Sequence, residues 1–442
     1  MRVGGKIQDV SGTEYLIEQV YRSGGQGDTF RARRTSGDTR EILVVKLYKH
    51  LETDRGERLD RIISQGHGIC LGFPEKTFCF PSRIIQHGGR EGVVMPHAPG
   101  VEMSELFEPP GNSAHSPRAW GIFRSGQIKY RTFLLNAFHL ARAINRLYRN
   151  GFTHCDLSIG NVFIDTSNGQ VSIIDLDNLA VEGFLPAKVV GTAGYTAPEL
   201  VTRQRSEPNH TTDAHSLAVL IFNLLMFRHP LVGSKINIDY ADDPFGQNAL
   251  YTDHPTNKSN RFTKGGFRLS DLPKDIQDLF HAAFVTGLHN SQHRPTATAW
   301  VKSLWKALEF LYVCEGCKQT TFFTNHSSPE CLFCGHKNKR PFAKLLFSNG
   351  SVKVIEAGSI LYPHHFSGSR QEYDLSEKLA DFKQQGRNDL ILANRSNHIL
   401  EVSFRRSSTV RRTVSRQHGV LISRTNRIYF PNGQYADVEF FA

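Results

Sequence analysis

The residues from 154 to 177 constrain this chain more than any other stretch. Asp156 is followed five positions later by Asn161, and Asp175 ends the apolar segment 171–174. Phosphoryl transfer demands little covalent chemistry from a protein, which contributes positioning and charge neutralisation. An aspartate can accept the proton of an incoming hydroxyl, while an asparagine and a second aspartate can hold Mg²⁺. The pattern predicts Asp156 as the proton acceptor and Asn161 and Asp175 as ligands of Mg²⁺ or Mn²⁺.

This stretch resembles the catalytic motifs of the eukaryotic-type protein kinases, which read H-R-D-L-x-x-x-N and D-F-G. The chain reads H-C-D-L-S-I-G-N from 154 to 161 and D-L-D from 175 to 177. The resemblance covers about residues 10 to 311, in the family's order of motifs. It implies a two-lobed fold and transfer of phosphate from ATP to serine or threonine, with Asp156 as catalytic base.

Two further features precede this loop. A glycine-rich turn at 22–27 separates two predicted strands, and a third strand at 42–46 ends in Lys46. A buried strand seldom holds an unpaired lysine, so the resemblance assigns Lys46 to the α- and β-phosphates of ATP. Glycines let backbone amides approach phosphates, and the three assigned to this role are Gly24, Gly25 and Gly27.

The resemblance also requires a carboxylate partner for Lys46 on the next helix. The pattern predicts that helix from 53 to 64. Glu57 is the preferred partner and Asp60 the alternative. The sequence does not separate the two, and either could instead be a surface carboxylate.

The hinge beside the adenine of ATP is assigned to the segment beginning at Met95. Pro96 has no amide donor, but its position needs only the carbonyl oxygen. The donor is required two residues later, where Ala98 supplies it. This segment is therefore compatible with ATP.

The later motifs match the family as well. The chain reads G-T-A-G-Y-T-A-P-E from 191 to 199. The resemblance pairs Glu199 with Arg294 and uses Asp213 to hold the catalytic-loop backbone. Residues 178–190 contain no serine, threonine or tyrosine, and Cys155 replaces the arginine that binds an activation-loop phosphate in many kinases. We therefore predict activity without activation-loop phosphorylation.

Four cysteines then occur in two C-x-x-C pairs thirteen residues apart. This spacing is typical of the tetrahedral thiolate shell of a structural zinc ion, whereas a redox dithiol fits two such pairs poorly. The predicted zinc ligands are Cys314, Cys317, Cys331 and Cys334.

Residues from 344 onward alternate as short strands, which predicts a small all-β sandwich. The seven predicted strands are 344–347, 351–355, 390–392, 399–404, 420–423, 427–430 and 436–441. The motif at 415–418 and the Asn432-Gly433 pair resemble the forkhead-associated domain. Only nine residues follow that pair, and Gly386-Arg387 is too distant from 415–418. We therefore expect a forkhead-associated-like sandwich that does not bind phosphopeptides.

The whole chain is predicted to be α+β, with three domains. A kinase domain at 1–311, divided into lobes near residue 98, precedes a zinc ribbon at 312–340 and a sandwich at 341–442. This order resembles bacterial kinases of tellurite-resistance-type stress systems, which implies a von Willebrand A-domain protein and a PP2C-type phosphatase as partners. The first residues lack a signal peptide and no apolar run reaches about 18 residues, so we expect a cytoplasmic protein.

The net charge of +11 does not by itself indicate nucleic-acid binding, because basic residues are spread along the chain. Their densest group, arginines between 405 and 427, is interpreted as a solvated sheet face. Three departures from the family, Arg22, Val44 and Ser158, keep a second hypothesis open. In it, the chain is a pseudokinase or weakly active scaffold that presents its ribbon and sandwich to partners.

Overall fold

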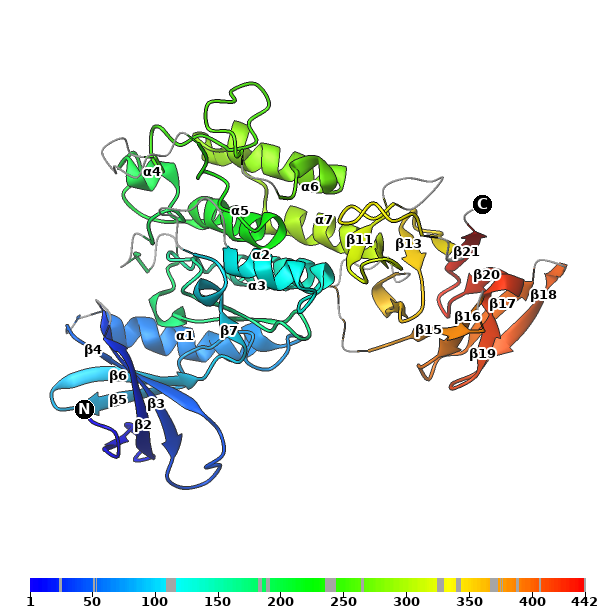
Figure 1. The fold of residues 1–442 in the computed structure, drawn as a ribbon. Coiled ribbons are helices and arrows are strands. Elements are labelled where there is room, and N and C mark those ends of the chain that lie inside the picture. The colour runs from blue at the N-terminus through cyan, green and yellow to red at the C-terminus, as the bar shows by residue number, and fades with distance from the viewer. Residues whose placement is uncertain are drawn as a thin grey trace. The chain divides into compact units, whose positions relative to one another are not determined.

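A computed structural model describes the chain except residues 24–25, 51, 53, 109–116, 182–184, 188–190, 235–243, 264–265, 324–329, 339–342, 366–372, 374, 376, 387–388, 405–406 and 441–442. The chain forms two compact units (Figure 1). The first consists of Met1–Ile128, Thr132–Leu269 and Ile276–Val301. The second consists of Lys129–Arg131, Ser270–Asp275 and Lys302–Ala442. The four-cysteine segment and the C-terminal strands thus belong to one unit.

The N-terminal part of the first unit is an antiparallel sheet in the order β1-β2-β3-β4-β6-β5. Its strands are β1 (Lys6–Gln8), β2 (Glu14–Ser23), β3 (Gly27–Arg34), β4 (Leu43–Tyr48), β5 (Arg83–His87) and β6 (Arg90–Pro96). Alternate residues such as Ile17, Phe30 and Val45 form a buried core. Lys46 and Tyr48 are two positions apart in β4, so their side chains leave the strand on the same side.

Helix α1 (Arg55–Cys70) follows β4 and turns one face inward. The buried positions include Arg55, Arg58, Leu59 and Ile62, which recur at the three- and four-residue spacing of an α-helix. The helix continues six residues beyond the predicted end. Gly66 permits this packing, because a Cβ there would lie 3.0 Å from the Cγ of Phe80.

The remainder of the first unit is mainly helical (Figure 1). Its helices include α2 (Pro117–Arg124), α3 (Tyr130–Arg149), α4 (Pro198–Val201), α5 (His210–Met226), α6 (Lys274–His281) and α7 (Ala297–Glu309), of which α3, α6 and α7 extend into the second unit. Helix α5 is central, since every residue from Thr212 to Met226 is buried. Asn209 caps it by accepting from the N–H groups of Thr211 and Thr212. No helix among the described residues combines the length and apolar character needed to cross a lipid bilayer.

A small sheet, β7-β8-β9, positions two loops of the first unit. Its strands are β7 (Val101–Glu102), β8 (Val162–Ile164) and β9 (Val171–Ile173). The loop before β8 contains Asp156, and the residues after β9 enter the short 3-10 helix η2 (Leu176–Asn178). Pairing of Val162 with Ile173 therefore brings the two loops together.

The second unit contains a two-stranded hairpin and two larger antiparallel sheets. The hairpin joins β10 (Leu311–Val313) and β11 (Thr320–Phe322). One larger sheet has the order β13-β12-β21-β20-β17-β18 and the other β14-β15-β16-β19. Side chains from both, including Leu345, Leu392 and Val402, form one buried cluster.

The strands of these sheets are β12 (Ala343–Phe347), β13 (Val352–Ile355), β14 (Ile360–Leu361), β15 (Ala380–Gln385), β16 (Asp389–Asn394), β17 (Leu400–Phe404), β18 (Ser407–Val414), β19 (Gly419–Leu421), β20 (Thr425–Tyr429) and β21 (Tyr435–Phe440). Seven correspond to predicted strands, whereas β14, β15 and β18 were not predicted.

Two arginines of the predicted basic face pair with neighbouring acids in the larger sheet. Arg411 contacts Glu401 at 3.2 Å, and Arg427 forms a two-pronged contact with Asp437 at 2.5 and 3.0 Å. Each guanidinium also lies 3.8 Å from the centre of a tyrosine ring. These contacts favour the sheet-face interpretation; Arg405 and Arg406 lie outside the described residues.

Candidate active site

The structure gathers three predicted residues around the loop before β8. The Nδ2 of Asn161 donates to the backbone oxygen of Asp156 at 2.7 Å and to its Oδ2 at 3.2 Å. The N–H of Ile174 donates to the carbonyl oxygen of Asn161 at 3.0 Å. Since Asp175 is the next residue, this bond places its carboxylate beside the loop.

Asp213 of α5 holds the backbone of the same loop, as predicted. Its two oxygens accept the N–H of His154 at 2.6 Å and the N–H of Cys155 at 3.1 Å. Cys155 has φ 73°, a conformation that costs free energy for a residue other than glycine. The two hydrogen bonds offset that cost. Burial raises the pKa of Asp213 to about 6, although the nearby His154 acts in the opposite direction.

Lys46 extends from β4 to the residues that follow β9. Its Nζ donates to Oδ1 of Asp175, to Oδ2 of Asp177 at 2.9 Å and to Oε1 of Gln26 at 3.3 Å. Burial alone would lower the pKa of Lys46, but the two carboxylates raise it above its usual value, so the ammonium stays charged. Burial likewise opposes ionisation of Asp175, yet Lys46 brings the pKa of that carboxyl below its usual range. A charged lysine–aspartate pair therefore links the sheet to the catalytic loop region.

The prediction that Glu57 of α1 pairs with Lys46 is wrong in this structure. Glu57 and the alternative Asp60 are both exposed. The helical period explains this result, because Arg58 and Leu59 occupy the inward positions between them. Among the described residues, the carboxylates within ion-pair distance of Lys46 belong to Asp175 and Asp177.

Asp177 is the residue that sequence reasoning missed. Its side chain is 0% exposed, and its Oδ2 accepts from Lys46 and from the hydroxyl of Tyr48, the latter at 2.7 Å. Burial raises the pKa of Asp177 despite the opposing charge of Lys46. The D-L-D sequence contained a signal for Asp177. It places a second acid directly after a buried strand, and a buried acid requires a partner.

The predicted nucleotide-contacting residues lie at opposite ends of the strands, because Gly27 pairs with Tyr48 at one end of β4 and Pro96 pairs with Leu43 at the other. Met95 and Pro96 end β6, while Ala98 is buried just beyond it. Gly27 begins β3, where a Cβ would lie 2.7 Å from the carbonyl oxygen of Leu47. That position therefore requires glycine. Gly24 and Gly25 lie outside the described residues.

The segment after Asp177 is held by two contacts of different kinds. The hydroxyl of Thr192 donates to Oδ1 of Asp156 at 2.6 Å. Farther on, Glu199 and Arg294 form the predicted pair through two bonds of 2.7 Å, which confirms that expectation. Both contacts fix residues 191–199 against the body of the unit.

An earlier part of the segment after Asp177 is held by a cation from α1. Arg58 donates to the carbonyl oxygens of Leu179 at 2.9 Å and Pro186 at 2.5 Å. Its side chain is 2% exposed. A buried guanidinium that bonds two carbonyls fixes them firmly, because its donors hold a rigid fork geometry.

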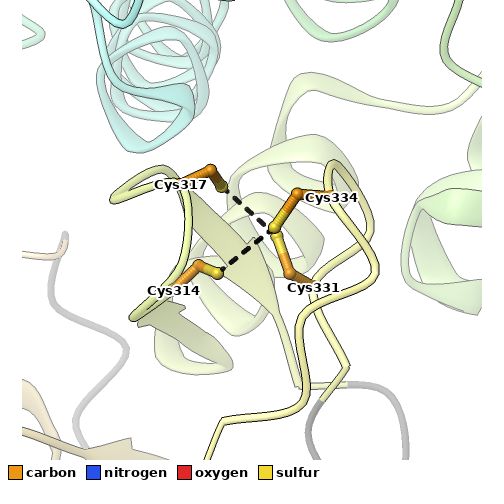
Figure 2. A group of neighbouring side chains, drawn as sticks. All are labelled: Cys314, Cys317, Cys331 and Cys334. Carbon is orange, nitrogen blue, oxygen red and sulfur yellow. Dashed lines mark hydrogen bonds between the residues drawn. The ribbon is translucent and has the colours of Figure 1, made fainter.

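The four predicted zinc ligands converge in the second unit (Figure 2). Their sulfur atoms all lie within 4.8 Å of one another, and Cys314–Cys334 and Cys317–Cys331 are each separated by 3.6 Å between sulfurs. A tetrahedral zinc with Zn–S bonds of about 2.3 Å places its sulfurs about 3.8 Å apart. A disulfide would require about 2.05 Å. The thiols therefore fit a tetrahedral metal ion.

Comparison with known proteins agrees with this geometry. Residues 114–306 match the protein kinase domain family. A probable serine/threonine-protein kinase PBL18 of Arabidopsis thaliana is 28% identical over 124 residues, which is 27% of this chain and 32% of that protein. Serine/threonine-protein kinase PknA of Mycobacterium tuberculosis is 30% identical over 114 residues, or 25% of this chain and 26% of that protein. The cell cycle serine/threonine-protein kinase CDC5/MSD2 of Saccharomyces cerevisiae is 32% identical over 101 residues, or 22% of this chain and 13% of that protein.

The matched regions cover at most about a third of each of these relatives. The domain match and the relatives' names support a serine/threonine protein kinase. The family match begins after Lys46 in the sequence. The contact of Lys46 with Asp175 is therefore independent support for the same class of site.

Proposed function

We propose that this chain is an active ATP- and Mg²⁺-dependent serine/threonine protein kinase that phosphorylates itself or a partner protein. One observation carries the proposal. Lys46 from the sheet contacts Asp175, and the preceding Ile174 bonds Asn161, which in turn bonds Asp156. A phosphate-binding cation, two oxygen ligands for a metal and a proton acceptor are thus assembled from separate segments.

Asn161 and Asp175 have oxygen atoms available to bind a magnesium ion. The Nδ2 of Asn161 bonds Asp156, which leaves its amide oxygen as the atom able to bind a cation. Asp175 accepts one hydrogen bond on each oxygen, from Lys46 and from Asn178, and a carboxylate has about four acceptor positions. Magnesium, when bound, would neutralise phosphate charge. The ligands would be Asn161 and Asp175, and Lys46 would hold the phosphates of ATP.

Asp156 has the surroundings of a proton acceptor for a hydroxyl. Its Oδ1 already accepts the hydroxyl of Thr192, a group of the same chemistry as a serine or threonine substrate. Its Oδ2 is oriented by Asn161 at 3.2 Å. A substrate hydroxyl in the same position would donate its proton to Asp156 as its oxygen bonds the γ-phosphorus of ATP and the bond from that phosphorus to the oxygen of the leaving ADP breaks.

The other parts of the proposal concern setting and partners. We propose that the four cysteines bind a structural Zn²⁺, since four thiolates leave no open position for a substrate. The order of kinase, ribbon and forkhead-associated-like sandwich supports a cytoplasmic role in a bacterial tellurite-resistance-type stress system. There, the proposed substrate is a von Willebrand A-domain protein, and a PP2C-type phosphatase would reverse its phosphorylation.

Transfer of radiolabelled phosphate from ATP tests this function. The assay compares the wild-type protein with Asp156→Asn and Asp175→Ala, using the chain itself and candidate partners as acceptors. We expect label on serine or threonine that requires Mg²⁺, a loss of at least about a hundredfold in Asp156→Asn, and no transfer by Asp175→Ala. Asp38→Asn, which alters an exposed carboxylate in the loop after β3, is the matched control. Full Mg²⁺-dependent activity in Asp175→Ala would contradict the assignment.

A pseudokinase scaffold is the second candidate. Ser158 favours it, because this buried position carries a serine where the family has a lysine that steadies the γ-phosphate. Loss of one fixed cation would slow transfer by about two orders of magnitude without abolishing it. A protein that binds ATP and partners but transfers no phosphate to any acceptor would favour the scaffold.

A further inference from the structure

The carboxylate that holds Lys46 comes from the loop after β9 and not from helix α1. Asp177 is two residues beyond Asp175, and Lys46 bridges them. Tyr48, which leaves β4 on the same side as Lys46, donates its hydroxyl to the same Oδ2 of Asp177 at 2.7 Å. The guanidinium of Arg55 lies 4.0 Å from the centre of the Tyr48 ring. Asp177 is therefore oriented by two donors of one strand.

Helix α1 has no equivalent carboxylate in position. Its inward side carries Arg55 and Arg58, whereas Glu57 is exposed. Consecutive residues differ by about 100° around a helix, so turning Glu57 inward would turn Arg58 away from the core. Arg58 is bonded to two carbonyl oxygens. The rotation would remove the donor from the buried oxygen of Leu179 and from the oxygen of Pro186.

We propose that Asp177 is the positioning residue that fixes Lys46 for phosphate binding, in place of a carboxylate on helix α1. The inference rests on the proposed function. Asp175 and Asp177 then have separate roles: Asp175 is available to a metal ion, while Asp177 remains with Lys46. Asp177 suits this role because it is buried and is oriented by Tyr48 as well as by Lys46. It can therefore keep the ammonium of Lys46 in one place whether or not Asp175 changes partner.

One test measures the environment of Lys46 without requiring turnover. An amine-acylating reagent is applied at fixed pH, without nucleotide or metal, and modification of Lys46 is followed by mass spectrometry. Asp177→Asn removes one of the two carboxylates that hold the ammonium, so we expect Lys46 to react about tenfold faster than in the wild type. Tyr48→Phe keeps the ring but removes the hydroxyl that orients Asp177, and we expect an intermediate rate. Asp38→Asn should match the wild type.

The second measurement is steady-state phosphoryl transfer. We expect kcat/KM for ATP to fall about tenfold in Asp177→Asn and less in Tyr48→Phe. Because Lys46 would hold the phosphates of ATP before transfer begins, the larger part of each loss should be a rise in KM. Glu57→Gln tests the rival arrangement. The proposal is overturned if Asp177→Asn changes neither measurement, or if Glu57→Gln lowers kcat/KM as strongly as Asp177→Asn.

The two measurements separate this inference from the proposed function. If the wild-type protein transfers no phosphate, the kinase assignment fails, and the acylation rates alone decide whether Asp177 holds Lys46. If Asp177→Asn does not fold, as judged by its thermal transition, Tyr48→Phe decides instead. An unchanged acylation rate in a folded Tyr48→Phe protein would then overturn the inference.

Discussion

At the scale of single residues, we expect the buried Asp213 to make turnover sensitive to acid. Burial raises its pKa to about 6, so the carboxylate that accepts the N–H groups of His154 and Cys155 becomes protonated in mild acid. We expect kcat to decrease as pH falls through about 6, because a protonated carboxyl loses acceptor strength on one oxygen and the left-handed Cys155 backbone loosens. The measurement is the pH profile of phosphate transfer at saturating ATP.

The same group affects stability with the opposite sign. Its folded pKa lies above the usual 3.8, so its contribution to stability is full below pH 3.8 and is lost as pH rises through about 6. A general unfolding in acid would lower kcat and stability together. Asp213→Asn separates the two explanations, since its lower activity should show no step near pH 6. A step that persists in this variant would contradict the prediction.

The sequence indicated most site residues at this scale but not their pairing. Lys46, Asp156, Asn161 and Asp175 were predicted because their chemistry and order are distinctive, and the structure places them close together. Glu57 was placed by resemblance, although the phase of a helix is set by all of its packed side chains. The inward arginines of α1 were the physical reason that a carboxylate had to come from elsewhere.

At the scale of elements, Arg58 holds the segment after Asp177 by contacts that require no phosphate. It joins α1 to the carbonyl oxygens of Leu179 and Pro186 without any modification of the chain. We therefore expect completely dephosphorylated protein, verified by mass spectrometry, to keep its initial rate. We also expect Arg58→Met to lose about tenfold or more in kcat, because the carbonyl oxygens of Leu179 and Pro186 both lose their donor.

The control for this prediction is Arg40→Met, which removes an exposed arginine from the loop before β4. Three hydroxyl groups, those of Thr192, Tyr195 and Thr196, are the alternative sites of control. Tyr195 is buried and Thr192 bonds Asp156, so phosphate on either would disturb packed contacts. A rate that collapses on dephosphorylation and returns only when one of these three is phosphorylated would refute the prediction.

The four-cysteine element should depend on its metal. The hairpin of β10 and β11 has only three residues in each strand, so we expect the proposed zinc to supply much of its folding free energy. We expect about one zinc per chain in protein purified without added metal. Cys331→Ser should lose the zinc and the local fold, as measured by elemental analysis and limited proteolysis. Cys70→Ser, outside the cluster, is the control, and a Cys331→Ser protein that keeps both would contradict the zinc assignment.

Elements with a clear alternating pattern were predictable, and those without one were not. Seven strands of the second unit coincide with predicted segments because their apolar residues alternate. Strand β18 was missed because Ser407–Val414 is a polar edge strand, held by pairing with β17. Strand β14 has only two residues. Such strands depend on neighbours distant in sequence, which a local pattern does not reveal.

At the scale of the molecule, two compact units predict two separable unfolding transitions. The second unit contains a buried ionic group that should distinguish them. Glu309 accepts from Lys353 and His365, each at 3.0 Å, and its side chain is 7% exposed. Burial alone would raise the pKa of Glu309, but Lys353 and His365 lower it to about 2.

The stability of the second unit should therefore decline in acid through Glu309. Its pKa is depressed from 4.5, so the stabilisation is full above pH 4.5 and is lost as pH falls from 4.5 to about 2. A shift of this size corresponds to roughly 3 kcal/mol. We expect Glu309→Gln to lower the free energy of unfolding of this unit by about that amount at pH 7, with the difference from wild type shrinking as pH falls below 4.5. Zinc release in acid weakens both proteins alike and cancels in this difference. The first unit's transition should not move, and a difference that stays constant down to pH 3 would show that Glu309 is not the responsible group.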